Sequence, residues 1–304
     1  MLENFDQLTK EAKAEPTLKL AVAAAENKIV LESVKRAVEL GIIEAILIGD
    51  EEQIKTEAEK IDYQPQHIMT TDSKTESAHK AVELISKGEA DFPMKGLLSS
   101  KAMLKALLNK KYGLRQDRLL STVTLINLTD KDGMVVVTDG GINIAPDLKE
   151  KVEIIKNSVE LTQALGVKES KVAALAAVEV VNPAMPATLE AAALAKMGDR
   201  GQIKGTIVDG PFALDNAICK EAAKQKGIHS PVAGEADILL VPNIEVGNVL
   251  YKSLIIYSGL EAASLAMGAK VPMVFTSRAD SVQTKFYSII LGKLATLGKL
   301  SKDK

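Results

Sequence analysis

Between Ile203 and Ser281 the chain has three short apolar runs, each of which ends abruptly in polar or turn-forming residues. The runs cover residues 205–208, 236–241 and 271–276, and segments with helical spacing separate them. Bounded runs of this kind are typical of buried parallel β-strands. Because ligands of open α/β sheets bind beyond the carboxyl ends of the strands, we expect functional residues at the three tips.

The three strand tips are rich in acids, amides and hydroxyls, and one of them carries an arginine. A planar guanidinium group at a strand tip is well suited to bind a phosphate. The alternative for the last tip is a serine that caps the following helix, with an Arg–Asp pair along it. The candidate residues at the tips are Asp209, Gly210, Asn243, Asn248, Ser277, Arg278 and Asp280.

Composition excludes several classes of partner. The chain has 304 residues, a net charge of −2 and 3% aromatic residues, which argues against nucleic acid as a partner. A single cysteine, Cys219, excludes an internal disulfide, and we expect it to pack on a helix. No histidine has a partner at metal-ligand spacing, so we expect no metal. The N-terminus lacks a signal peptide and no run is long enough to span a membrane, which predicts a cytoplasmic protein.

The first part of the chain alternates between predicted strands and helices, which indicates a doubly wound parallel sheet. A first helix is expected within residues 1–16. The strands are expected at 18–25, 45–48, 67–69 and 91–95, and the helices between and after them at 30–40, 51–60, 74–87 and 101–109.

A predicted hairpin then interrupts this alternation. Its strands, residues 119–128 and 133–138, are joined by the four-residue loop 129–132, and so short a loop favours antiparallel pairing. The change suggests a second α/β domain at residues 129–268, with the first domain formed by 1–128 and 269–304. Further helices are expected at 147–165, 186–197 and 281–297, and a further strand at 172–177.

Two glycine-containing turns are candidate anion sites. Asp139, Gly140 and Gly141 follow a strand, and paired glycines let N–H groups approach an anion. The alternative is a turn that only connects two elements. Lys95 precedes a second turn, where Ser99 either caps the next helix or helps to bind a phosphate.

Two arginines, Arg115 and Arg118, lie in the loop at the expected domain junction. A surface arginine is most often a solvated charge. Two of them beside a cleft can hold a phosphate through paired hydrogen bonds, and Arg118 is the stronger candidate.

Several long motifs, taken in order, resemble the phosphate acetyl/butyryltransferase family, and most of all its butyryl branch. They are MKGLLSS, YGLRQDRLLS, TDGGINIAPDLKEKVEII, DRGQIKGTIVDGPFALDNAI, SPVAGEADILLVPNIEVGN and VPMVFTSRADS. The resemblance implies two α/β domains like those of isocitrate and isopropylmalate dehydrogenases, a cleft between them, and a dimer or higher oligomer. It also implies acyl transfer between coenzyme A (CoA) and inorganic phosphate, without a tightly bound cofactor.

The same resemblance implies roles for individual residues. Arg118 would hold the phosphoryl group, Ser277 would steady the thiol or carbonyl, and Arg278 would bind phosphate or CoA. Acetyl-specific members carry an aspartate base six residues after this arginine, where this chain has Thr284. Asp280 is the nearest substitute.

The expected reaction is butyryl-CoA plus phosphate to butyryl phosphate plus CoA. One rival is a phosphate acetyltransferase that uses acetyl-CoA. A second is an NAD-dependent decarboxylating dehydrogenase, although no metal-binding aspartate cluster is found for it. A third is a catalytically silent protein that binds CoA or phosphate.

Overall fold

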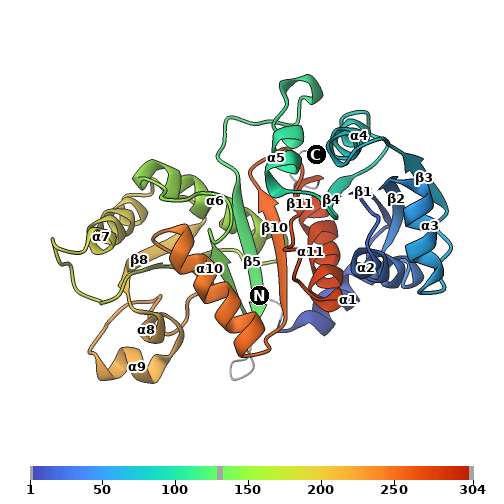
Figure 1. Ribbon diagram of the computed structural model, residues 1–304. Helices are drawn as coiled ribbons and strands as arrows, with labels where there is room; N and C mark the ends of the chain where they lie inside the picture. The colour runs from blue at the N-terminus through green and yellow to red at the C-terminus, as the bar shows by residue number, and fades with distance from the viewer. Residues whose placement is uncertain (1–2, 129–132, 301–304) are drawn as a thin grey trace. The chain divides into compact units, whose positions relative to one another are not determined.

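The computed structural model describes residues 3–128 and 133–300, and it has a mixed α/β fold in which helices flank a β-sheet (Figure 1). The chain divides into two compact units. Phe5–Arg118 and Glu261–Lys304 form one, called here the terminal unit; Met1–Asn4 and Leu119–Leu260 form the other, the central unit. The α/β class is therefore confirmed, whereas the predicted domain boundaries stay a prediction. The loop predicted at 129–132 lies outside the described residues.

In the terminal unit the strands follow the order β3-β2-β1-β4-β11-β10. Neighbours are parallel except for β10, which runs antiparallel to β11. Strand β10 has the sequence AASLAM, which lacks β-branched residues and was not expected as a strand. The strands are β1 (Leu18–Ala23), β2 (Ile43–Gly49), β3 (His67–Thr70), β4 (Phe92–Lys95), β10 (Ala262–Met267) and β11 (Met273–Val274).

Helices cover both faces of these strands: α2, α3 and α11 lie on one face and α4 and α5 on the other (Figure 1). Local signals start and end them. Side chains of Asn27, Asp50, Ser73 and Ser99 cap the N-termini of α2 to α5. The helices are α1 (Phe5–Ala14), α2 (Lys28–Glu39), α3 (Glu51–Glu59), α4 (Lys74–Ser86), α5 (Ser100–Leu107), the 3₁₀ turn η1 (Lys110–Tyr112) and α11 (Val282–Leu300).

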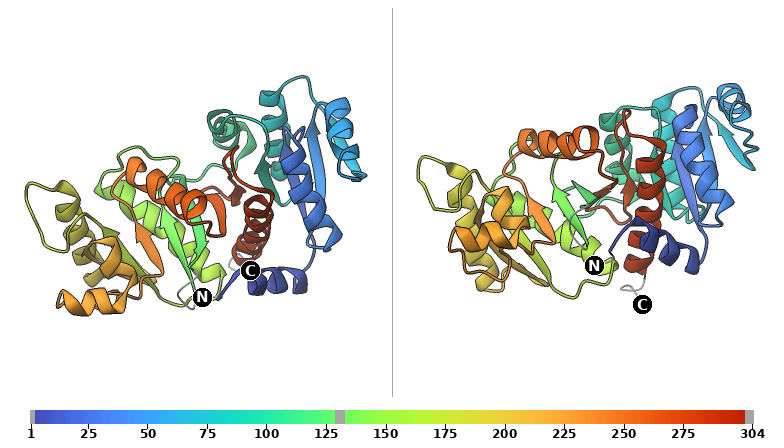
Figure 2. Two further views of the ribbon diagram at one scale, coloured as in Figure 1. Left: turned by 60° about the horizontal axis from the view of Figure 1, so that its bottom comes forward. Right: turned by 90° about the horizontal axis from the view of Figure 1, so that it is seen from below.

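In the central unit the strand order is β5-β6-β9-β7-β8. Strands β5 and β6 are antiparallel, which confirms the predicted hairpin, and the remaining neighbours are parallel. Helices α6 and α7 lie on one face and α8, α9 and α10 on the other (Figure 2). The strands are β5 (Ser121–Asn127), β6 (Met134–Thr138), β7 (Ser170–Leu175), β8 (Thr206–Phe212) and β9 (Ile238–Leu240).

The helices of the central unit correct two details of the sequence analysis. The segment expected as a strand tip at 242–248 is largely helical, because α10 begins directly after Asn243. Cys219 lies in extended backbone between two short helices rather than on a helix. The helices are α6 (Leu148–Ala164), α7 (Pro186–Asp199), α8 (Leu214–Ile218), α9 (Lys220–Gln225), α10 (Ile244–Lys252) and the π-helical η2 (Ser253–Tyr257).

Among the described residues, no helix combines the length and the apolar character that crossing a bilayer requires.

Candidate functional site

The terminal unit brings the end of β4 next to the turn that follows β11. Val274 of β11 pairs in parallel with Met94 of β4, so the two carboxyl ends lie side by side. Lys95 is the last residue of β4, and only 4% of it is exposed. Lys95 of the motif MKGLLSS and the turn in the motif VPMVFTSRADS are thus neighbours in space, although they are far apart in the sequence.

Residues 277–280 form a tight turn ahead of α11, and Asp280 holds it closed. Its Oδ2 accepts a hydrogen bond from the Ser277 N–H at 2.6 Å. Asp280 is buried, whereas Ser277 and Arg278 are exposed. The N-terminal turn of α11 is capped by Ser281, whose Oγ accepts from the Thr284 N–H at 3.1 Å. A serine of this tip therefore caps the helix, as the alternative interpretation allowed, and it is Ser281. The Ser277 hydroxyl instead accepts a hydrogen bond from the Ala279 N–H at 3.4 Å.

Lys285 of α11 is a further member of this cluster that the sequence analysis did not single out. It is 3% exposed, and its ammonium donates a hydrogen bond to the Ser277 carbonyl at 2.7 Å. The available signal in the sequence is that this lysine directly precedes the mostly apolar run FYSIILG. Lys285 therefore anchors the turn that carries Ser277 and Arg278.

The electrostatics of this cluster are dominated by positive charge. Burial, then the neighbouring Lys285 and Arg278, lower the pKa of Lys95 to about 8, and Asp280 opposes them. Burial also lowers the pKa of Lys285, again against Asp280. Two further cationic groups and one carboxylate thus act on Lys95, and this net positive arrangement attracts an anion. Lys95, Ser277, Arg278, Asp280 and Lys285 are called here the cationic cluster.

The other candidates of the terminal unit lie on its loops. Ser99 caps α5 by accepting from the Ala102 N–H at 3.2 Å, so the capping role is present. Arg115 is exposed and Arg118 is half-buried in the segment between η1 and β5. Any contact of these three with substrate stays a prediction.

In the central unit, Asp139 organises the turn after β6. Asp139 is 2% exposed, and its carboxylate accepts hydrogen bonds from Thr122 (N–H and hydroxyl), Gly141, Ile142 and Asn143 (N–H and amide). The Gly140 N–H donates to the Thr122 hydroxyl at 3.1 Å. The expectation that the Gly140 and Gly141 N–H groups are exposed to an anion is therefore wrong, because internal acceptors take them.

Close packing explains why glycines stand in this turn. A Cβ on Gly140 would lie 2.9 Å from the Gly247 carbonyl carbon, and one on Gly247 would lie 2.7 Å from the Gly140 Cα. The turn after β6 therefore packs directly on the start of α10. Asn243 caps α10 by accepting from the Val246 N–H at 3.0 Å, and Asn248 donates to the Gly140 carbonyl at 3.4 Å. Asp139, Gly140, Gly141, Asn243 and Asn248 are thus brought together.

Asp209 and Gly210 lie apart from that group. They are inside β8, which continues to Phe212, so the prediction that the strand ends before Asp209 is wrong. The pairing register shifts between Ala173 and Leu175, which marks an irregularity opposite them. Strand β7 separates β8 from β9, the strand that leads into α10.

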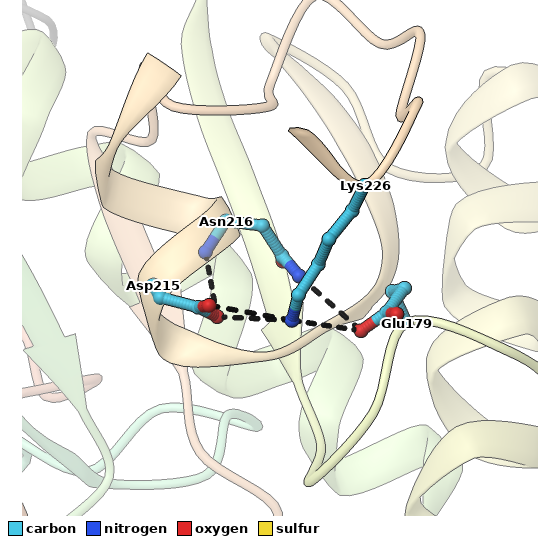
Figure 3. Close-up of polar contacts among 4 residues, drawn as sticks. All are labelled: Glu179, Asp215, Asn216 and Lys226. Carbon is cyan, nitrogen blue, oxygen red and sulfur yellow. Dashed lines mark hydrogen bonds and ion pairs between the residues drawn. The ribbon is translucent and has the colours of Figure 1, made fainter. Parts of the chain in front are cut away.

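A polar cluster in the central unit was not expected from the sequence (Figure 3). The Lys226 ammonium contacts Glu179 Oε2 at 3.1 Å and Asp215 at 3.3 Å. The hydrogen bond from Lys226 is the main reason that the pKa of the Glu179 carboxyl is lowered. The Asn216 amide donates to Glu179 at 3.4 Å. The cluster thereby ties the segment after β7 to α8 and α9.

A cavity of about 970 Å³ in the terminal unit contains none of the predicted residues. It lies at the carboxyl ends of β2 and β3 and is lined by Glu26, Asp50, Thr70 and Thr71, among others. Within residues 3–128 and 133–300, no three His, Cys, Asp or Glu side chains are grouped as a metal ion would require.

Comparison with known proteins gives a consistent result. The family model for phosphate acetyl/butaryl transferase matches residues 75–292. The chain is 46% identical to phosphate butyryltransferase of Clostridium beijerinckii (97% of this chain, 98% of the relative). It is 47% identical to phosphate acetyltransferase of Thermotoga maritima (90% and 93%). The crystal structure of a branched-chain phosphotransacylase from Enterococcus faecalis aligns with a TM-score of 0.83 at 31% identity (92% and 99%). The chain therefore belongs to the phosphate acetyl/butaryl transferase family.

Proposed function

We propose that this protein transfers a butyryl group, or a similar short acyl group, between CoA and inorganic phosphate. The observation that carries the proposal is the cationic cluster at the ends of β4 and β11, which contains three cationic groups, Lys95, Lys285 and Arg278, and a single carboxylate. Phosphate and acyl-CoA are both anions, so a site that joins them needs such an excess of positive charge. Membership of the family, and relatives named as butyryl- and acetyltransferases, support the same reaction.

In the proposed mechanism, Arg278 and Arg118 hold the phosphate and align it with the thioester carbonyl. A phosphate oxygen attacks this carbonyl, the carbonyl oxygen gathers negative charge, and the exposed Ser277 hydroxyl donates a hydrogen bond to it. The C–S bond then breaks and CoA leaves as a thiolate. Lys285 keeps the turn in place through its hydrogen bond to the Ser277 carbonyl. No tightly bound cofactor takes part.

The finer architecture belongs to the same proposal. The two units would correspond to the two domains of isocitrate and isopropylmalate dehydrogenases, with the substrates bound in a cleft. Asn248 and Asp209 of the central unit would contact substrate there, as would Arg115, Ser99 and the Gly140–Gly141 turn. The protein would work as a homo-oligomer, which light scattering during size-exclusion chromatography measures directly.

The decisive assay is phosphate-dependent release of CoA thiol from acetyl-, butyryl- and isobutyryl-CoA. Faster release from the four-carbon thioesters is the expected result. A preference for acetyl-CoA would identify a phosphate acetyltransferase instead. If no thioester reacts but CoA binds in calorimetry, the protein is a catalytically silent binder.

Replacing Arg278 or Arg118 by alanine should lower kcat/KM at least about 10²-fold, because the anion loses a charged hydrogen-bond donor. Circular dichroism should show an unchanged fold. The matched control is Arg200→Ala at the exposed end of α7, which should keep normal activity. Near-normal rates for both active-site variants would mean that the site is wrongly placed.

A further inference from the structure

We infer that the Lys95 amine is the proton acceptor for the CoA thiol when CoA attacks the acyl phosphate, and the proton donor to the thiolate in the opposite direction. This inference rests on the proposed function, and it assigns the base that the sequence left open at Thr284.

The placement of Lys95 supports this role. Its side chain is enclosed at the carboxyl end of β4, beside the turn that carries Ser277 and Arg278. The ammonium lies 5.9 Å from the centre of the Phe275 ring, and among the described residues no hydrogen-bond acceptor is found for it. A lysine that served only the fold would be expected to donate hydrogen bonds, as Lys285 does to Ser277.

The alternative bases of the cluster are already engaged. The Thr284 hydroxyl lies 3.1 Å from the Ser281 hydroxyl in the first turn of α11. The Asp280 carboxylate is buried and accepts the Ser277 N–H. Of the histidines in the terminal unit, His79 forms a hydrogen bond with the Tyr112 hydroxyl, and His67 is exposed on β3. Among these candidate bases of the terminal unit, Lys95 is thus the buried one for which no side-chain hydrogen bond is found in the described part of the chain.

The charged groups that act on Lys95 make it suitable for proton transfer. Lys285 from α11 and Arg278 from the turn disfavour its protonated form, Asp280 favours it, and burial disfavours it most. These effects bring the pKa of the amine to about 8, so the neutral form is a minority near neutral pH and becomes the larger part only above pH 8. A base with a pKa near the working pH is the most effective one.

The step balances as follows. The thiol S–H bond breaks and its proton moves to Lys95 Nζ, while the sulfur electron pair forms the C–S bond. The bond between the acyl carbon and the phosphate oxygen breaks, and its electron pair leaves on phosphate. In the opposite direction, protonated Lys95 returns the proton to the departing thiolate.

The test is the pH dependence of acyl-CoA formation from butyryl phosphate and CoA. In the wild type, kcat/KM should rise with pH through an apparent pKa near 8, because only the neutral amine accepts a proton. Lys95→Arg keeps the charge but cannot be deprotonated. It should therefore lower kcat about 10²-fold and abolish this inflection, with little change in KM for butyryl phosphate. Lys105→Arg, on the exposed face of α5, is the matched control and should behave as the wild type.

Chemical rescue provides a second measurement. Lys95→Ala should regain activity in proportion to the concentration of free ethylamine, a response that a purely structural lysine would not give. The inference is overturned if Lys95→Arg retains the wild-type profile, if it changes only KM, or if Asp280→Asn alone removes the inflection. An active wild type with any of these outcomes refutes only the role of Lys95, whereas an inactive wild type refutes the proposed function itself.

Discussion

At the residue scale, Asp139 shows how a polar side chain at a strand tip can serve the fold. Its two oxygens accept six hydrogen bonds from Thr122, Gly141, Ile142 and Asn143. The carboxylate thus fixes the turn after β6 and joins it to β5. Any effect of this residue on substrate would then act through the shape of the turn.

Replacing Asp139 by asparagine should destabilise the protein by about 3 kcal/mol, because the new amide N–H₂ would face hydrogen-bond donors in a buried place. Urea unfolding monitored by circular dichroism measures the loss. The matched control is Asp209→Asn, since Asp209 is half-buried and accepts from the Gly210 N–H at 2.7 Å. Equal losses for the two variants would contradict the structural role of Asp139.

At the scale of elements, two glycines let α10 approach the turn after β6. Gly247, in the first half of α10, contacts Gly140 of that turn, backbone against backbone. Because backbone atoms form both sides of this contact, neither can move aside as a flexible side chain could. The position of Asn243 and Asn248 relative to Asp139 therefore depends on the absence of two Cβ atoms.

Gly247→Ala should cost about 1–3 kcal/mol, because the new Cβ would lie 2.7 Å from the Gly140 Cα and 2.9 Å from the Asp139 carbonyl oxygen. Thermal unfolding gives the loss. The control is Val249→Ala on the same helix. Val249 is 65% exposed, so its replacement should change the free energy of unfolding by at most about 0.5 kcal/mol. If Gly247→Ala is as harmless as this control, the close contact is not tight in solution.

At the scale of the whole molecule, the terminal unit is completed by the end of the chain. Helix α11 packs on β10 and α2, and the buried Lys293 ammonium donates to the carbonyls of Ala12 at 2.7 Å and Glu15 at 3.0 Å. Residues 5–118 therefore lack a large part of their core until residues 261–304 are present. Almost all of the central unit, in contrast, is one continuous segment.

A fragment of residues 119–260 should therefore unfold cooperatively on its own, whereas residues 5–118 alone should expose apolar surface and bind a hydrophobic dye. Co-expression of residues 261–304 with residues 5–118 should reduce this dye binding and restore cooperative unfolding. Calorimetry and dye fluorescence are the measurements. Cooperative unfolding of residues 5–118 alone would show that α11 is dispensable.

Local patterns predicted most of the fold. The runs at β1, β2 and β4 are apolar and bounded, and the helix-capping role offered for Ser99 is present in the structure. The prediction failed where the local signal was weak. Strand β10 has no β-branched residue, and α10 follows Asn243, which the sequence pattern assigns to a strand tip.

The candidate site could be predicted in part. Lys95, Ser277, Arg278 and Asp280 were identified from motifs, and the structure places them together. Lys285 was missed, because a lysine on a helix is usually solvated and the apolar run that follows it is only a weak signal of burial. The N–H groups of Gly140 and Gly141 were misjudged, because their acceptors include Thr122, which lies on another strand.

The sequence by itself determined the α/β class, most of the elements and the family, because periodicity, caps and long motifs are properties of neighbouring residues. Only the tertiary structure decided what the polar groups do. Burial of Lys95 and Lys285, and the engagement of Asp139 by Thr122, arise where segments distant in the chain meet. The charge state and the hydrogen-bond partners of a side chain depend on that encounter, so local sequence does not contain them.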